Sequence, residues 1–352
     1  MSDHRRLGSL RIGYSAYSAD QSKPGDRRRF PHYAKCRGIS IELADPAETY
    51  DMVVLSARSD LTHWADSPDS TRIVYDLIDS YLAIPESDFK ARLRGLSKYA
   101  IGELSQPAWS YRRTIEKMAR RADAVVCSTL EQKQMLEEFC PNVHVILDFH
   151  TELAGPRKDH YESSQPFRLV WEGLPKNLHG FRDITEVLER VSREHPLALH
   201  LVTDLHYFEF LDQLWKRSSR RLASRILESS KIHTWNPKTL VSVATSSDLA
   251  VIPLDLNDPF AAGKPENKLF LFWRLGVPAL VSATPAHRRA MDAAGLDMAV
   301  AHPEEWEARL RLLITQESTR RRAGRLGAGY AEGEAGEAPL IEKWDAVVKS
   351  LW

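Results

Sequence analysis

The residues best suited to chemistry lie in the C-terminal half, where an apolar strand leads through a polar loop to a cationic helix start. The run from Leu249 to Leu254 has the length and the branched side chains of a buried parallel strand. The sequence Lys-Pro-Glu-Asn-Lys then begins a helix, because apolar residues from Leu269 onward recur at helical spacing. Backbone N–H groups at a helix start attract anions, and the Lys268 ammonium lies in its first turn. We therefore expect an anion site suited to a diphosphate.

Composition places the chain among ordinary globular proteins. It has 352 residues, of which 43% are hydrophobic and 27% charged, so two domains of common size are the natural division. No apolar run reaches the ~20 residues that span a bilayer, and the first residues lack the apolar core of a signal peptide, so we expect a cytoplasmic protein. The three cysteines are Cys36, Cys127 and Cys140, and their spacing predicts neither a disulfide framework nor a zinc site.

The charges are balanced, with 48 basic and 48 acidic residues. A duplex-binding protein usually carries a basic face, so we expect no nucleic-acid partner. Local arginine clusters remain, and most are expected to be solvated helix faces. One or two of them are compatible with a phosphorylated substrate, or with peripheral contact with anionic lipid at the inner face of a membrane. These clusters are Arg27 to Arg29, Arg112 and Arg113, Arg120 and Arg121, Arg217 with Arg220 and Arg221, and Arg320 to Arg322.

The first half alternates short apolar strands with helical segments, which is the rhythm of an open parallel sheet. A long, mostly helical insertion at 86–121 separates the fourth strand from the fifth, with a break at Pro107 and Trp109. Thr129 is expected to cap the helix after the fifth strand. The six expected strands are 10–14, 40–43, 52–56, 73–76, 124–128 and 143–147.

A polar segment at 151–166 is expected to link this sheet to a second one. We expect domains at residues 1–155 and 156–335, with a final helix in 336–352 that crosses back to the first. Gly327 to Ala338 is expected to be a loop. The second sheet's expected strands are 167–171, 197–202, 231–234, 249–252, 279–282 and 298–301, with helices near 182–194, 207–228, 237–245, 264–274, 285–294 and 303–316.

Several motifs in order resemble the GT-B fold of nucleotide-sugar glycosyltransferases. They are IVYDLIDS, RADAVVCSTLEQKQML and DFHTE in the first half, then WEGLPKN, SSDLAVIPL and PENKLFLFWRLGVP in the second. The closer likeness is to the retaining, family 4-like group typified by bacterial polysaccharide mannosyl- and glucosyltransferases. The resemblance implies an α/β protein with two Rossmann-like lobes facing a central cleft, each built on a parallel sheet. It implies a hexosyltransferase that is independent of metal, has no cofactor and uses a nucleotide-diphosphate sugar as donor.

The same resemblance implies where the donor binds. Cationic side chains of the second lobe would neutralise the leaving diphosphate, and Lys176 and Lys268 are the matching residues, with Asn177 beside Lys176. Lys176 has an alternative interpretation as a surface lysine. Trp235, which follows a second-lobe strand, is a candidate to stack on the base, or else a core or rim tryptophan.

The chain departs from this family at two positions. The family often carries two glutamates eight residues apart, whereas this chain has Gly263 and Leu271 at the matching places. Neither side chain can accept a hydrogen bond from a sugar hydroxyl. Glu266 and Asn267 at the helix start can take over, or the donor is held in another way, or the activity is lost.

In the first lobe, Asp79 follows the strand that ends at Asp76, where open parallel sheets place ligand-binding groups. We expect Asp79 to face the acceptor, as a general base if the enzyme inverts and as an orienting group if it retains. The alternative is a carboxylate that caps the next helix or is simply solvated. His63 is a second candidate near the sugar, by the resemblance, although a solvated histidine is the alternative. Ser15 and Tyr17, after the first strand, are expected to bound the cleft.

Three functions are compatible with these residues. The favoured one is transfer of a sugar to a carbohydrate, lipid-linked or other hydroxyl acceptor in bacterial polysaccharide or glycoconjugate synthesis. A nucleotide-sugar 2-epimerase shares the architecture but needs a denser set of acids and bases around one sugar. A catalytically silent scaffold or binding subunit is the third, because the paired glutamates are missing.

Overall fold

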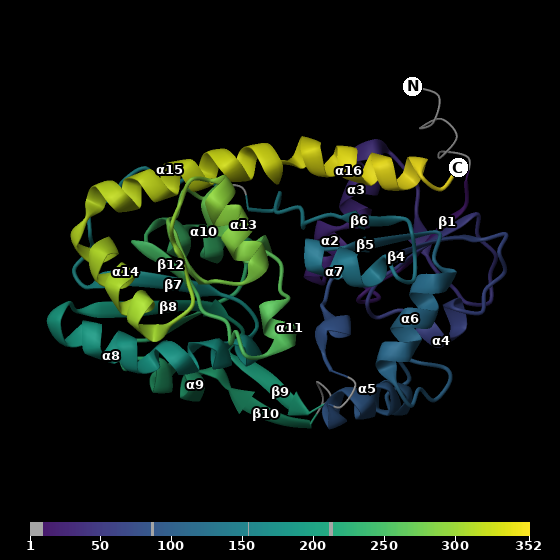
Figure 1. Cartoon of the computed structure of the whole chain (residues 1–352), viewed down its shortest axis with the longest axis horizontal. Coiled ribbons are helices and arrows are strands. Elements are labelled where there is room, and N and C mark those ends of the chain that lie inside the picture. The colour runs from purple at the N-terminus through teal and green to yellow at the C-terminus, as the bar shows by residue number, and fades with distance from the viewer. Residues whose placement is uncertain (1–9, 86–87, 154, 211–213) are drawn as a thin grey trace. The chain divides into compact units, whose positions relative to one another are not determined.

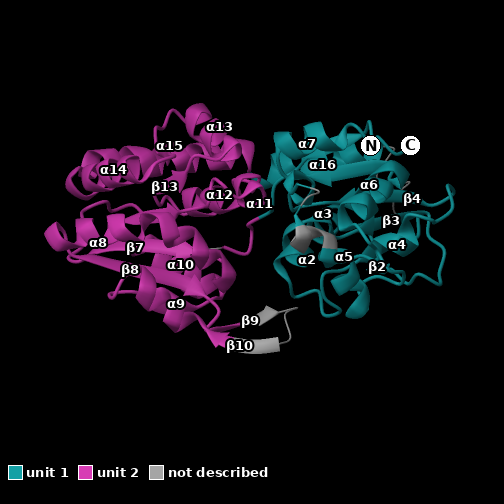
Figure 2. Cartoon of the chain, turned by 60° about the horizontal axis from the view of Figure 1, so that its bottom comes forward, with its two compact units in different colours: residues 1–149, 336–352 teal, residues 150–335 magenta. Residues whose placement is uncertain are grey.

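The computed structural model describes residues 10–85, 88–153, 155–210 and 214–352. The chain forms two compact units, the first built from Met1–Phe149 with Gly336–Trp352 and the second from His150–Ala335 (Figure 2). The sequence placed the corresponding boundaries after residues 155 and 335. Among the described residues, none of the helices combines the length and the hydropathy that crossing a bilayer requires.

Unit 1 is organised around a six-stranded parallel sheet with strand order β2-β1-β3-β4-β5-β6. Figure 1 labels four of these strands, β1, β4, β5 and β6. Its central strands are buried on both faces, as their continuous apolar runs predict. Every expected strand of this half is present, with ends that differ by at most two residues. The strands are β1 (Ile12–Ser15), β2 (Glu42–Leu43), β3 (Met52–Leu55), β4 (Arg72–Asp76), β5 (Ala124–Cys127) and β6 (Val143–Val145).

Three helices of unit 1, α4, α6 and α7, begin at a polar side chain that accepts a hydrogen bond from their first backbone N–H groups. Ser110 accepts from the Arg113 N–H to start α6, which explains the break at Pro107 and Trp109. Thr129 caps α7, as expected. The helices are α2 (Pro24–Arg28), α3 (Phe30–Arg37), α4 (Leu61–Trp64), η1 (Tyr81–Ala83), α5 (Phe89–Ala100), α6 (Tyr111–Arg121), α7 (Leu130–Leu136) and α16 (Glu337–Lys349).

Unit 2 contains a second six-stranded parallel sheet, with strand order β11-β8-β7-β12-β13-β14. β7 and β12 are parallel neighbours at its centre. The motifs WEGLPKN and SSDLAVIPL, which contain the ends of these strands, therefore lie at the same edge of the sheet. The strands are β7 (Phe167–Glu172), β8 (Leu197–Thr203), β11 (Lys231–Thr234), β12 (Leu249–Ile252), β13 (Ala279–Ser282) and β14 (Ala299–Val300). The helices are η2 (Pro175–Ile184), α8 (Thr185–Glu194), α9 (Ser219–Ile226), α10 (Pro237–Thr245), α11 (Pro259–Ala262), α12 (Asn267–Arg274), α13 (Pro285–Ala293), α14 (Pro303–Thr315) and α15 (Glu317–Glu334).

The expected helix at 207–228 is wrong over its first half. An antiparallel pair, β9 (His206–Phe210) and β10 (Leu214–Ser218), precedes a short α9, and residues 211–213 lie outside the described part of the chain. This stretch carries Tyr207, Phe208, Phe210 and Trp215. Aromatic residues favour strands, and that preference prevails here over an apolar spacing that also fits a helix.

The expected loop at Gly327 to Ala338 is also wrong, because α15 continues to Glu334 and α16 begins at Glu337. The glycines allow close packing rather than a turn. A Cβ on Gly327 would lie 2.4 Å from the Trp273 ring, and one on Gly324 would lie 2.5 Å from the Gly276 carbonyl oxygen. Without these Cβ atoms α15 approaches α12 closely, and this contact fixes the helix that begins with Asn267 and Lys268.

Three arginines of the expected solvated clusters are buried instead. Arg28 is 7% exposed, Arg29 is 0% exposed and Arg320 is 1% exposed. Arg320 donates to the carbonyl oxygens of Leu313, Ile314 and Tyr161, so it satisfies the last turn of α14 and a neighbouring loop. Their burial removes these three side chains from any surface that could meet lipid.

Candidate functional site

The carboxyl edge of the unit 2 sheet gathers Lys268 and Trp235 around Glu172, the last residue of β7. Lys268 Nζ donates a 2.9 Å hydrogen bond to the Glu172 carbonyl oxygen and lies 4.9 Å from the centre of the Trp171 ring. Trp235 Nε1 donates to the Glu172 carboxylate at 3.0 Å. Two residues predicted to bind the donor therefore contact the same third residue.

Gly173 lets the Lys268 ammonium reach the backbone at this edge. A Cβ on Gly173 would lie 2.2 Å from Lys268 Nζ and 2.9 Å from the Trp171 ring, and its φ is +157°. The Thr203 hydroxyl fixes the same peptide by donating to the Gly173 carbonyl oxygen at 2.6 Å. A side chain here would displace the Lys268 ammonium, and the backbone conformation also favours glycine.

A second lysine contacts the loop that follows β7. Lys264 Nζ donates to Asn177 Oδ1 at 3.0 Å, which ties the start of the α12 segment to η2. Lys176 is exposed on η2, next to Asn177. The sequence prediction included Lys176 and Asn177 but not Lys264, although Lys264 stands four residues before Lys268 and both cations reach the same loop region.

The start of α12 provides the remaining predicted donor residues. Glu266 occupies the N-cap position without a side-chain capping bond, and both Glu266 and Asn267 are half-buried. Leu271, at one of the two positions where the family often has glutamate, is 1% exposed and belongs to the core. Gly263, at the other, ends α11. Neither position therefore offers a polar side chain to a sugar.

His287 is a buried neighbour of Lys268 that the sequence did not reveal. Its Nδ1 lies 2.8 Å from the Ser282 carbonyl oxygen, so Nδ1 carries the hydrogen and donates it. Burial lowers the pKa of His287 to about 4, and the positive charge of Lys268 acts in the same direction. The imidazole is therefore neutral at pH 7, and it adds no positive charge to that of the lysines at this edge.

Unit 1 presents a different set of groups at the carboxyl ends of its strands. Arg29 forms a bidentate pair with Asp76, with Nη2–Oδ1 and Nε–Oδ2 distances of 2.5 and 3.0 Å and exposed side-chain fractions of 0% and 4%. Arg29 also donates to the Ile146 carbonyl oxygen at 2.6 Å. Asp76 is thus held by a buried cation.

Asp79 is half-buried and lies near two tyrosines. Burial and then the Asp79 carboxylate raise the pKa of Tyr81. Burial, then Asp76, and also Asp79 raise the pKa of Tyr17 well above its ordinary value, while Arg29 opposes this rise. Tyr17 and Asp79, both predicted from sequence, therefore belong to one polar cluster.

Ser15 and His63 lie at the carboxyl ends of neighbouring strands of the same sheet. The sequence placed Ser15 in the loop after the first strand, whereas the structure includes it in that strand. Ser15 is the last residue of β1, and His63 lies on α4 after β3 with its ring against the edge of Trp64 at 5.1 Å. Asp60 accepts from the His63 N–H, so the short helix is capped and its orientation fixed. Both side chains are half-buried.

Comparisons with known proteins reveal the fold. No family model matches the chain, and no curated protein matches it. Among solved structures, it is similar to TarM with a TM-score of 0.59, 11% identity and coverage of 84% of this chain and 54% of TarM. It is similar to a mutant TarM from S. aureus, in complex with fondaparinux, α-GlcNAc-glycerol and UDP, with a TM-score of 0.58, 8% identity and coverage of 84% and 55%.

A third similar structure is sucrose-phosphate synthase from Thermosynechococcus elongatus, with a TM-score of 0.58, 11% identity and coverage of 92% of this chain and 76% of that one. The chain thus spans about half the length of TarM and three quarters of the synthase. The fold is the GT-B fold, with two six-stranded parallel sheets, so the resemblance drawn from the sequence is confirmed for the fold.

Proposed function

We propose that this chain is a glycosyltransferase that moves a sugar from a nucleotide-diphosphate donor to a hydroxyl acceptor in bacterial polysaccharide or glycoconjugate synthesis. The observation that carries the proposal is the position of the Lys268 ammonium, in the first turn of α12 and 2.9 Å from the Glu172 carbonyl oxygen. A lysine and the N–H groups of a helix start bind phosphate oxygens well. The UDP and the sugar in the TarM complex support the same classes of donor and acceptor.

In this proposal, unit 2 binds the donor. Lys268, with Lys264 and Lys176 on adjacent segments, stabilises the negative charge that grows on the diphosphate as the glycosidic bond breaks. Trp235, whose ring nitrogen is engaged with Glu172, offers its face to the base. Glu266 and Asn267 accept hydrogen bonds from ribose or sugar hydroxyls. These lysines supply the countercharge of the leaving group, so the proposal assigns no cofactor and no metal to the transfer step.

Unit 1 supplies the acceptor side in this proposal. Asp79 accepts a hydrogen bond from the attacking hydroxyl and, if the reaction inverts, its proton. Tyr17, Ser15 and His63 bound the acceptor site. We place the reaction in the cytoplasm, and at the inner face of the membrane where the acceptor is lipid-linked. Exposed basic residues of α6, Arg113 and Arg120, are suited to peripheral contact with anionic lipid.

A second function, that of a catalytically silent donor-binding or scaffold subunit, is favoured by one observation. Leu271 is buried in the core and Gly263 has no side chain, so the chain lacks the polar groups that the family often places at these positions. Loss of such groups removes transition-state stabilisation without necessarily removing diphosphate binding.

Turnover separates the two functions. A panel of nucleotide sugars is incubated with the protein, and the released nucleoside diphosphate is measured with and without carbohydrate acceptors. We expect release from a donor in the panel, at least tenfold slower in Lys268→Ala, because one charge-assisted hydrogen bond contributes roughly 1.5–3 kcal/mol. Lys231→Ala, an exposed lysine at the amino end of β11 and therefore at the opposite sheet edge, is the matched control and keeps its rate. Binding without any turnover across the panel would support the scaffold function.

A further inference from the structure

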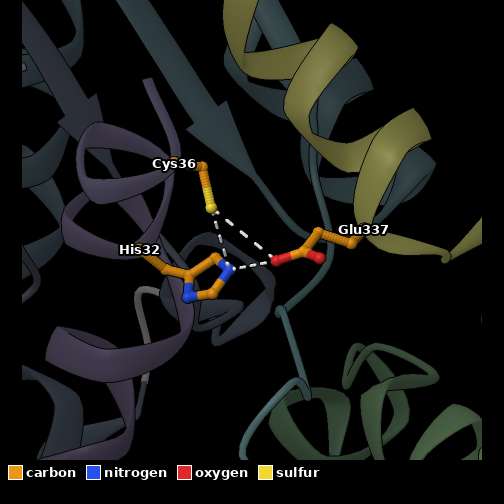
Figure 3. A group of neighbouring side chains, drawn as sticks. All are labelled: His32, Cys36 and Glu337. Atoms are coloured by element: carbon orange, nitrogen blue, oxygen red, sulfur yellow. Dashed lines mark hydrogen bonds and ion pairs between the residues drawn. The ribbon is translucent and has the colours of Figure 1, made fainter. Parts of the chain in front are cut away.

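Three side chains with metal-ligand chemistry converge in unit 1, where α3 packs against α16. His32 and Cys36 are four residues apart on α3 and so share one face of that helix, and Glu337 is the first residue of α16. Glu337 Oε1 lies 2.7 Å from His32 Nε2, and Cys36 Sγ lies 3.4 Å from the same nitrogen and 3.7 Å from Glu337 Oε1. Figure 3 shows the three polar ends pointing toward one another.

These separations are close to those of ligands around one zinc ion. Zinc bound tetrahedrally to imidazole, thiolate and carboxylate has bond lengths of about 2.0–2.3 Å, which places the ligand atoms about 3.4–3.6 Å apart. The distances from Cys36 Sγ to the two other atoms, 3.4 and 3.7 Å, are already close to these values. Only the distance between His32 Nε2 and Glu337 Oε1 must increase. The Glu337 side chain is 48% exposed and has room to turn.

The geometry fits a metal better than it fits an activated nucleophile. In a cysteine–histidine–acid nucleophile the thiol and the acid hold opposite ring nitrogens, so that the imidazole relays a proton. Here Cys36 and Glu337 both approach Nε2 of His32. Convergence of three different ligand types on one point is what a single cation requires.

The two helices that carry these residues are fixed by packing of their own. Trp344 of α16 lies against Phe30 and Tyr33 of α3, with ring-centre distances of 5.5 and 6.0 Å. An ion pair between Arg37 and Asp345 joins the same helices further along. Ligands on helices that are already packed hold their geometry, which lowers the cost of binding an ion.

The cluster also lies where the chain leaves unit 1 and where it returns. The His32 ring is 4.5 Å from that of Phe149, the last residue before the chain enters unit 2. Glu337 is the second residue after the chain returns to unit 1. An ion at this point would tie α3 to the first turn of α16.

We propose that His32, Cys36 and Glu337 bind one zinc-type divalent cation that fixes the start of α16 against α3. A set of one nitrogen, one sulfur and one oxygen ligand suits Zn²⁺ and Co²⁺ rather than Mg²⁺ or Ca²⁺. Water takes the fourth position, and the Cys36 thiol releases its proton to solvent when it ligates. The cysteine spacing alone predicts no such site, because the third ligand comes from the other end of the chain. This proposal is independent of nucleotide binding.

Metal titration of the full chain tests the proposal. Chelator-treated protein is titrated with Zn²⁺ alone by calorimetry, and with Co²⁺ while the thiolate-to-metal absorption band is followed. We expect one equivalent of either ion per chain, a thiolate band with Co²⁺, and a rise in melting temperature with Zn²⁺. Cys36→Ser, His32→Gln and Glu337→Gln should each lower the affinity at least about tenfold, and Cys36→Ser should abolish the band.

Glu342→Gln, an exposed acid on the same helix, is the matched control and should bind zinc as the wild type does. Circular dichroism and metal-free melting show whether each variant is folded, and if Cys36→Ser is not, the two other ligand variants decide. Absence of a stoichiometric zinc-dependent signal would overturn the proposal. So would wild-type affinity in both His32→Gln and Glu337→Gln, which would mean that the thiol alone attracts the ion.

Discussion

Gly173→Ala perturbs the proposed donor site without removing any of its charges. Real Cβ contacts are essentially never shorter than 3.0 Å, whereas a Cβ on Gly173 would lie 2.2 Å from Lys268 Nζ, so the ammonium must move by at least 0.8 Å. The Trp171 ring, 2.9 Å from the same Cβ, limits where it can go. The hydrogen bond from Lys268 to the Glu172 carbonyl oxygen, now 2.9 Å, would therefore be lost or redirected.

The expected effect follows from the value of a charged hydrogen bond. Such a bond contributes roughly 1.5–3 kcal/mol, and each 1.4 kcal/mol is a factor of ten in affinity, so a misplaced ammonium should weaken binding of a nucleoside diphosphate by about 10- to 100-fold. The φ of +157° adds strain for alanine, so we also expect a loss of about 1–3 kcal/mol in the free energy of unfolding.

Calorimetry with a nucleoside diphosphate measures the affinity, and denaturant unfolding measures the stability. Gly329→Ala on α15 is the matched control, because a Cβ there meets nothing within 4 Å. It should leave the affinity unchanged and, as a glycine inside a helix, raise stability by about 0.5–1 kcal/mol. If folded Gly173→Ala binds the diphosphate as tightly as the wild type, the glycine does not position Lys268 for an anion and the reasoning is refuted.

Three further predictions concern both units. Asp79→Asn should lower turnover about 100-fold or more with little change in donor affinity. Steady-state kinetics measures the turnover and calorimetry the affinity, and equal losses in both would show that Asp79 does not face the acceptor. The folded pKa of His287, about 4, is below its ordinary 6.5, so stability is complete above pH 6.5 and falls as the pH drops toward 4, by up to about 3 kcal/mol. Denaturant unfolding from pH 7 to 4 checks this, and a pH dependence that is not reduced in His287→Asn would contradict it. Arg29→Ala leaves Asp76 buried without its cation and should cost about 3–5 kcal/mol of unfolding free energy, whereas a loss below 1 kcal/mol would show that the pair is dispensable.

The strands of both sheets could be predicted from the sequence because their apolar runs are short, continuous and bounded by turn residues. The helix start at Lys268 was equally visible, since Lys-Pro-Glu-Asn-Lys interrupts two apolar segments. Where the prediction was wrong, local patterns were ambiguous. The aromatic stretch from Tyr207 fits two periodicities, and the glycines of α15 mimic a loop until the ring of Trp273 is seen to occupy the space beside Gly327.

Some residues of the candidate site could also be predicted from the sequence, whereas others could not. Lys268 and Trp235 could be chosen by type and position, but their common partner, Glu172, could not, because it depends on β7 and β11 ending at one sheet edge. His287 could be recognised as part of the site only from the structure, which shows that it is buried next to Lys268. Asp76, which the sequence could not distinguish from Asp79 by position alone, is committed to Arg29, a residue that the sequence placed in a solvated cluster.

The central claim is that the carboxyl edge of the unit 2 sheet binds the diphosphate of an activated sugar through Lys268. Calorimetric titration of UDP, GDP and ADP into the wild type, Lys268→Ala and Lys231→Ala tests it most directly. We predict saturable 1:1 binding of at least one nucleotide, weakened about tenfold or more by Lys268→Ala and unchanged by Lys231→Ala. Failure of all three nucleotides to bind the wild type, or equal affinity in the two variants, would contradict it.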